Sequence, residues 1–239
     1  MSLRSVRYSK KYSRVVIYTE GCVFNCKGCS YKAKINRNRI KKRNITIDKI
    51  KKILKIFDPK YLHFVGGEPL HTPEVYDIAN FSRRLGIKNV IGHSTGWYLP
   101  SNDFDKINIT IKSYNSEIHK EYTGYSNKRI LRNFKKCYEL GLKIKASTVF
   151  IPSFIDEEEI KKIAKFISKI DSSIPLHITG YIPMPGTPWR APTQKEMENV
   201  VKITKKYLKN VTYSLYKNVE EYSKMIRENP QYQSVEILA

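Results

Sequence analysis

Three of the four cysteines of this 239-residue chain fall within one short segment, at Cys22, Cys26 and Cys29, in the spacing C-x3-C-x2-C. Thiols so close together in sequence cannot form a disulfide framework for a chain of this length, so the cluster indicates metal ligands in a reducing compartment. The fourth cysteine, Cys137, lies on the apolar stripe of an expected helix, and we predict that it is a small core residue.

The composition excludes several classes of protein. Hydrophobic residues make up 41% of the chain, which is too many for a disordered chain, while 28% charged residues and a mean hydropathy of −0.49 are unlike a membrane protein. No apolar run approaches the roughly 18 to 20 residues that a membrane span needs, and the first residues lack the apolar run of a signal peptide. We therefore expect a cytoplasmic protein without a membrane anchor.

Short runs rich in β-branched and aromatic residues alternate with amphipathic helical segments. The strand-like runs cover residues 14–18, 61–65, 89–93, 107–111, 144–151 and 176–182. Capping residues mark the helix starts at Asn44 or Thr46, at Thr72, at Asn127, at Asp156 and at Thr193. Strands that alternate with helices predict a parallel sheet in an α/β fold.

The pattern predicts a single domain over residues 1–239, with a core at about 14–210 and a C-terminal extension at 211–239. Right-handed crossovers between six such strands give a partial (β/α)6 barrel. An open, doubly wound sheet is the alternative.

The cysteine segment directly follows the first of these strands, where (β/α) folds keep their chemistry. Three thiolates on one tight loop can hold three irons of a [4Fe–4S] cluster and leave the fourth iron open to a substrate. A structural zinc site is the alternative, but it needs a fourth ligand. The nearest imidazole, His63, has no second cysteine pair or histidine beside it.

A second motif, Gly66-Gly67-Glu68-Pro69, follows the next strand. Two glycines allow a close approach of the backbone to a ligand, and the Glu68 carboxylate can accept hydrogen bonds from an ammonium group. By itself this segment is an ordinary turn at the end of a strand. Its position next to the cysteine loop favours a ligand-binding role.

Together the two motifs resemble the radical S-adenosylmethionine (SAM) superfamily. The resemblance implies a (β/α) barrel, a [4Fe–4S] cluster on Cys22, Cys26 and Cys29, and reductive cleavage of SAM to a 5′-deoxyadenosyl radical. It also implies contacts to SAM at Gly28, Ser30, Gly66, Gly67, Glu68 and Lys112.

Within the superfamily, residues 112–119, 122–131, 149–152 and 156–159 are similar to the activating enzymes of glycyl radical enzymes, of the pyruvate formate-lyase activase type. This narrower resemblance runs from about Ile17 to Val201. It implies removal of a hydrogen atom from a glycine Cα on a partner protein, with a flavodoxin or ferredoxin as the one-electron donor. Loops containing Trp97, residues 122–127 and residues 183–189 are then expected at the barrel mouth.

Several positions depart from the pattern of that family. Two acidic positions, which the family uses for a monovalent cation beside SAM, are His93 and Thr110 here, so we expect no such ion. An arginine expected on the fifth strand is Ser147. The core chemistry can survive these changes, but the identity of the partner does not follow from the resemblance.

The chain carries 44 Lys and Arg against 22 Asp and Glu, a formal net charge of +22. Lysines on the solvent side of helices, as in residues 47–56, account for much of this excess. The charge also allows a radical SAM enzyme that modifies RNA or a nucleotide-derived small molecule. A non-enzymatic zinc-binding module is the second alternative.

Overall fold

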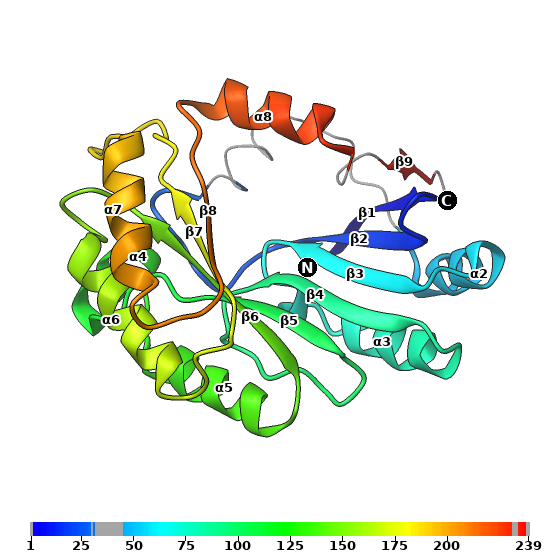
Figure 1. The fold of residues 1–239 in the computed structure, drawn as a ribbon. Helices are drawn as coiled ribbons and strands as arrows, with labels where there is room; N and C mark the ends of the chain where they lie inside the picture. The colour runs from blue at the N-terminus through cyan, green and yellow to red at the C-terminus, as the bar shows by residue number, and fades with distance from the viewer. Residues whose placement is uncertain (1, 30, 32–44, 231–233, 238–239) are drawn as a thin grey trace.

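The computed structural model describes residues 2–29, 31, 45–230 and 234–237. Within this part of the chain, nine strands form one sheet in the order β8-β7-β6-β5-β4-β3-β2-β1-β9 (Figure 1). The strands are β1 (Ser2–Ser9), β2 (Arg14–Glu20), β3 (Tyr61–Gly66), β4 (Lys88–Ser94), β5 (Lys106–Thr110), β6 (Lys143–Phe150), β7 (Leu176–Gly180), β8 (Val211–Ser214) and β9 (Val235–Glu236). The helices are α2 (Ile47–Phe57), η1 (Pro69–His71), α3 (Glu74–Arg84), α4 (Ser116–Thr123), α5 (Lys128–Glu139), α6 (Glu157–Ser168), α7 (Gln194–Thr204) and α8 (Val219–Glu228).

Strands β2 to β8 pair in parallel and follow one another in chain order, whereas β1 and β9 add antiparallel pairs at one edge. The sheet curves, and α2, α3, α5, α6 and α7 lie on its outer side (Figure 1). Sequential strand order with helices on one side is the winding of a barrel, since a doubly wound sheet reverses its strand order at a switch point. The partial-barrel prediction is confirmed and the doubly wound alternative is wrong.

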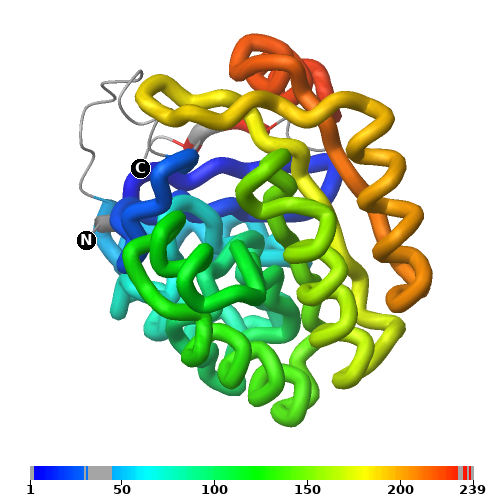
Figure 2. The backbone as a smooth tube through the Cα atoms, turned by 90° about the vertical axis from the view of Figure 1, so that its left-hand side faces the viewer, coloured from blue at the N-terminus to red at the C-terminus, as the bar shows by residue number. Residues whose placement is uncertain are grey.

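All six predicted strands are present, but the sequence pattern did not predict β1, β8, β9, α4 or α8. Strand β8 has only four residues, and β1 mixes polar and apolar residues as edge strands commonly do. These strands extend the sheet beyond residues 14–210. Figure 2 shows the blue N-terminal strands beneath the orange and red C-terminal segment that contains α8.

Three of the five helix starts have the predicted side-chain cap, whereas Asn127 makes none and α3 follows Pro73 with no cap from Thr72. The side chains of Thr46 and Asp156 accept hydrogen bonds at the starts of α2 and α6, and Thr193 forms a capping box with Glu196. Asn127 precedes α5 but makes no capping bond, and its amide binds elsewhere. Asn44 lies outside the described residues.

The core lies between the outer face of the sheet and the helices. Ile107 and Ile109 of β5 are buried there, as is Cys137 of α5, which confirms its prediction as a core residue. Among the described residues, no helix is both long and apolar enough to cross a membrane.

Candidate functional site

The cysteine loop leaves the C-terminal end of β2 at Gly21, whose φ of 100° is accessible mainly to glycine. Two backbone hydrogen bonds fix the loop to the end of α4. Asn25 N–H donates to the Thr123 carbonyl at 3.0 Å, and Lys27 N–H donates to the Tyr122 carbonyl at 3.0 Å. Helix α4, which the sequence pattern missed, is therefore the support of this loop.

Phe24, between the first two cysteines, anchors the loop in the core, where only 3% of its side chain is exposed. Its ring meets the edge of Trp97 at 5.8 Å and of His119 at 5.6 Å, and it stacks on Tyr125 at 5.7 Å. Each aromatic pair of this kind contributes about 0.5–1.5 kcal/mol beyond the burial of its area, so the three contacts stabilise the position of the loop.

The three clustered cysteines are partly buried, and none of them forms a disulfide. Burial raises the pKa of Cys22 to about 12; the Phe24 N–H bond opposes this rise, and negative charge at Glu68, Cys26 and Cys29 adds to it. The thiols therefore lie close enough to repel one another as thiolates, and a bound cationic centre would relieve that repulsion.

No three His, Cys, Asp or Glu side chains of the described residues converge on a point that could hold a single metal ion. His63, the ligand considered for zinc, does not join the cysteines. A [4Fe–4S] cluster has a different requirement, because each thiolate binds a different iron and the sulfur atoms need not meet at one point. The donor set of three thiols on one loop fits such a cluster.

The two glycines of the second motif lie against the backbone of β2. A Cβ on Gly66 would overlap the Thr19 carbonyl, and a Cβ on Gly67 would overlap the Gly21 carbonyl. The amide of Glu68 donates to the same Gly21 carbonyl at 2.8 Å. The glycines thus allow a close approach to protein backbone, and their contact with a ligand stays a prediction.

Glu68 itself is fully buried, and four protein donors bind its carboxylate. They are Leu70 N–H at 3.2 Å, Ser94 Oγ at 3.1 Å, Thr95 N–H at 2.5 Å and Thr95 Oγ1 at 2.6 Å. Burial raises the pKa of this carboxyl group, and the bonds from Thr95, Leu70 and Ser94 oppose the rise. The carboxylate joins the β3 and β4 loops, so in this structure it is not the open acceptor for an ammonium group that the sequence predicted.

Gly28 packs against two tyrosines at the base of the cysteine loop. A Cβ at this position would lie 2.6 Å from Tyr181 Cε2 and 2.9 Å from Tyr122 Oη, closer than carbon side chains pack. The packing accounts for glycine here independently of any ligand. Ser30 lies outside the described residues.

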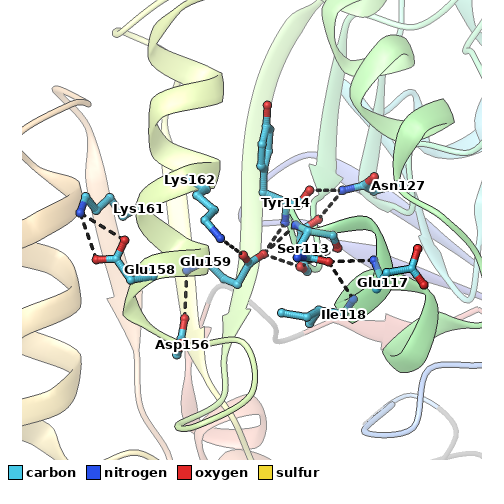
Figure 3. A network of polar contacts seen from close by, with 11 residues as sticks. Ser113, Tyr114, Glu117, Ile118, Asn127, Asp156, Glu158, Glu159, Lys161 and Lys162 are labelled. Carbon is cyan, nitrogen blue, oxygen red and sulfur yellow. Dashed lines mark hydrogen bonds and ion pairs between the residues drawn. The ribbon is translucent and has the colours of Figure 1, made fainter.

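Lys112 follows β5 and is partly exposed, and the loop after it is held by Glu159 of α6 (Figure 3). The Glu159 carboxylate accepts from Ser113 Oγ at 2.5 Å and from the backbone N–H groups of residues 114–115 at 2.9 and 2.8 Å. Lys162 Nζ lies 2.8 Å from its other oxygen. Burial raises the pKa of Glu159, but Lys162 and the other donors outweigh that effect and lower it.

Asn127 reinforces the same loop from the other side. Its amide donates to the Ser113 carbonyl at 3.1 Å and to the Tyr114 carbonyl at 2.5 Å (Figure 3). The sequence pattern identified Asn127 only as a helix start, and it included Glu159 only in the segment 156–159. The position of an acid in the first turn of the helix did not indicate this further role.

The positions that depart from the activating-enzyme pattern lie on the inner face of the sheet. Thr110 Oγ1 and Ser147 Oγ are 2.9 Å apart, and His93 Nδ1 is 3.1 Å from Asn108 Nδ2. Neither His93 nor Thr110 supplies a carboxylate, so neither provides the negative charge of the acidic cation ligands.

Comparison with known proteins gives consistent matches. The sequence profile of the radical SAM superfamily matches residues 16–167. A protein of Methanocaldococcus jannaschii that carries the name of a glycyl-radical enzyme activating enzyme is 30% identical over 89% of this chain and 86% of its own length. A GTP 3′,8-cyclase of Clostridium perfringens is 25% identical over 83% of this chain and 66% of its own length.

Among solved structures, Streptococcus suis SuiB bound to SAM superposes with a TM-score of 0.64 at 17% identity. The match covers 86% of this chain and 52% of SuiB, so the chain spans about half of that protein. At this identity the match supports the fold alone.

Gly67→Ala should destabilise the protein by about 3 kcal/mol, since the new Cβ meets backbone that cannot move without displacing the cysteine loop. The control is Gly186→Ala, where φ is 78° but no atom lies within 4 Å, so only backbone strain of about 1 kcal/mol is expected. Equilibrium urea unfolding measures both. Equal losses would contradict the steric account.

Glu159→Gln should cost about 2 kcal/mol, because an amide cannot accept all the donors that the carboxylate accepts. The matched control is Glu158→Gln on the same helix, where an exposed pair with Lys161 is lost and less than about 0.5 kcal/mol is expected. Thermal unfolding compares the two. A Glu159→Gln variant as stable as the control would show that the network does not hold the loop.

Proposed function

This chain belongs to the radical SAM superfamily, and we propose that Cys22, Cys26 and Cys29 hold its [4Fe–4S] cluster beside a SAM site formed by the turn at residues 66–68 and Lys112. When bound, the cluster supplies one electron that cleaves SAM to methionine and a 5′-deoxyadenosyl radical, which removes a hydrogen atom from the substrate. The observation that carries the proposal is the hydrogen bond from Glu68 N–H to the Gly21 carbonyl, since it brings the two motifs side by side.

The residues of the chain then position SAM and shield the radical from water. Backbone carbonyls of the turn at residues 66–68 are the acceptors for the ammonium group of SAM, because protein donors occupy the Glu68 side chain. The Lys112 ammonium pairs with the SAM carboxylate. Phe24, Trp97 and Tyr125 exclude water beside the loop, where a carbon radical would otherwise be quenched. No side chain needs to act as an acid or a base.

For the finer role, we propose that the hydrogen donor is a glycine Cα of a partner protein and that a flavodoxin or ferredoxin supplies the electron. The M. jannaschii relative, which the chain matches over most of both lengths, supports this role. The loop at residues 183–189 adds support: its Trp189 stacks on Phe154 at 4.5 Å and contacts Tyr122 at 5.7 Å, which makes a rigid aromatic rim near the cysteine loop.

A second candidate is hydrogen abstraction from a nucleotide-derived small molecule. Strands β3 to β8 contain Lys and His residues but no Asp or Glu, and such a sheet suits an anionic substrate. The similarity to GTP 3′,8-cyclase points in the same direction.

Protein reconstituted anaerobically with iron and sulfide should form 5′-deoxyadenosine from SAM and dithionite, as measured by mass spectrometry. Cys26→Ala should abolish product formation, because the cluster loses one of its three ligands. Cys137→Ala removes a buried thiol outside the loop and should retain activity. No product from a preparation with a verified cluster, together with no SAM-induced change in its EPR signal, would refute the proposal.

The hydrogen donor can be identified by isotope transfer. Extract from source cells grown on glycine deuterated at Cα is separated into protein and low-mass fractions, and each is added to the reconstituted enzyme. Deuterium in 5′-deoxyadenosine from the protein fraction only is expected for a glycyl target, because the radical takes the Cα deuterium. Turnover that depends on the low-mass fraction would favour the second candidate instead.

A further inference from the structure

The two faces of the sheet differ in chemistry. On β5, Ile107 and Ile109 are buried against the helices, so the alternating Asn108 and Thr110 point to the inner face. Side chains of neighbouring strands also form hydrogen bonds on this inner face, where Thr110 Oγ1 lies 2.9 Å from Ser147 Oγ on β6. The outer face is thus a packed apolar core, and the inner face is polar.

Basic and neutral hydrogen-bonding groups collect on that inner face beside Lys112. We define the inner basic patch as His93 on β4, Asn108 on β5, Lys145 and Ser147 on β6, and His177 on β7. Register places Lys145 opposite Asn108 and Ser147 opposite His177. The His177 ring reaches β8, with Nδ1 2.8 Å from Thr212 Oγ1 and Nε2 3.1 Å from Ser214 Oγ.

The strands that carry the patch supply no compensating acid. The sequences of β3 to β8 contain no Asp or Glu. In the part of the chain that the structure describes, neither Lys112 nor Lys145 forms an ion pair. Lys145 is exposed on this face and is therefore accessible to a ligand.

Burial and nearby positive charge together keep the histidines of the patch uncharged. The His93 side chain is open to solvent on the inner face, yet enough protein surrounds its ring that burial lowers its pKa to about 4. Three groups add to that shift: Lys112, Lys145 and His177. Burial and Lys145 also lower the pKa of His177. At neutral pH the imidazoles are therefore uncharged, and the positive charge of the patch resides on lysine.

We propose that the inner basic patch is the specificity site for the substrate and binds an oxyanion, phosphate or carboxylate, of the hydrogen donor. Lys145 supplies the ion pair, and the His93 ring and the neighbouring hydroxyl groups supply hydrogen bonds, whereas both ring nitrogens of His177 already bind β8. The site adjoins Lys112, so an anion held there keeps the rest of the donor near the SAM site. The identity of the ligand as hydrogen donor rests on the proposed function; the binding of the anion does not.

The test is calorimetric titration of the anaerobically reconstituted protein with two probes, inorganic pyrophosphate and a hexaglutamate peptide, at constant ionic strength. Lys145→Gln should weaken binding about tenfold, as loss of a charged hydrogen bond does. Lys145→Arg should retain binding because it keeps the charge. Lys136→Gln, on the exposed face of α5, removes the same charge elsewhere and should leave binding unchanged. Circular dichroism verifies that each variant is folded.

A second readout does not depend on affinity. Bound pyrophosphate should raise the pKa of His93 in an NMR titration of the ring, since an anion stabilises the imidazolium against Lys112, Lys145 and His177. If binding of pyrophosphate depends on Lys145, the proposal is supported and the hydrogen donor is a phosphorylated molecule. If binding of the peptide depends on Lys145, the proposal is supported and the donor is an acidic protein segment. Binding of neither probe, or equal weakening by Lys145→Gln and Lys136→Gln, overturns it. Formation of 5′-deoxyadenosine by the same preparation reports separately on the proposed function.

Discussion

The contact between the end of β2 and the turn after β3 is the constraint on which the rest of the site depends. Two neighbouring glycines let the backbone of this turn lie directly on the Thr19 and Gly21 carbonyls, where any side chain would collide. Because backbone meets backbone, the distance between the cysteine loop and the turn is set without flexible side chains. A cofactor that must touch both loops therefore meets a preformed site rather than one assembled on binding.

Two buried carboxylates fix the positions of the neighbouring loops in the same way. Glu68 accepts from donors in the β4 loop, and Glu159 accepts from donors in the loop that follows Lys112. Buried carboxylates are costly unless they are fully hydrogen-bonded, so each enforces one arrangement of the backbone N–H groups around it. In a reaction whose intermediate is a radical, such positioning is the main contribution that these loops can make.

The sequence predicted the central strands, since β-branched runs between helical segments leave few alternatives, and it predicted the cysteine loop from its spacing. It could not reveal the partners of Glu68, because Ser94 and Thr95 approach that carboxylate only through the pairing of β3 with β4. The roles of Gly67 and Asn127 were missed for the same reason. Each depends on a contact between segments distant in sequence, whereas the local pattern equally suits a ligand-binding turn or a helix cap.

The resemblance to activating enzymes implies acidic residues on the inner face, but that face is basic in this chain. A carboxylate at position 93 or 110 would hold a cation beside SAM, but histidine and threonine occupy these positions, and no strand from β3 to β8 supplies an acid in their place. Lys112 and Lys145, which form no ion pair in the part of the chain that the structure describes, act on the same region, and they add to the effect of burial in lowering the pKa of His93. A cation would add to this repulsion and an anion would relieve it. The absence of acidic residues at positions 93 and 110 and the two lysines nearby act in the same electrostatic direction, which favours a negatively charged substrate over a bound metal cation.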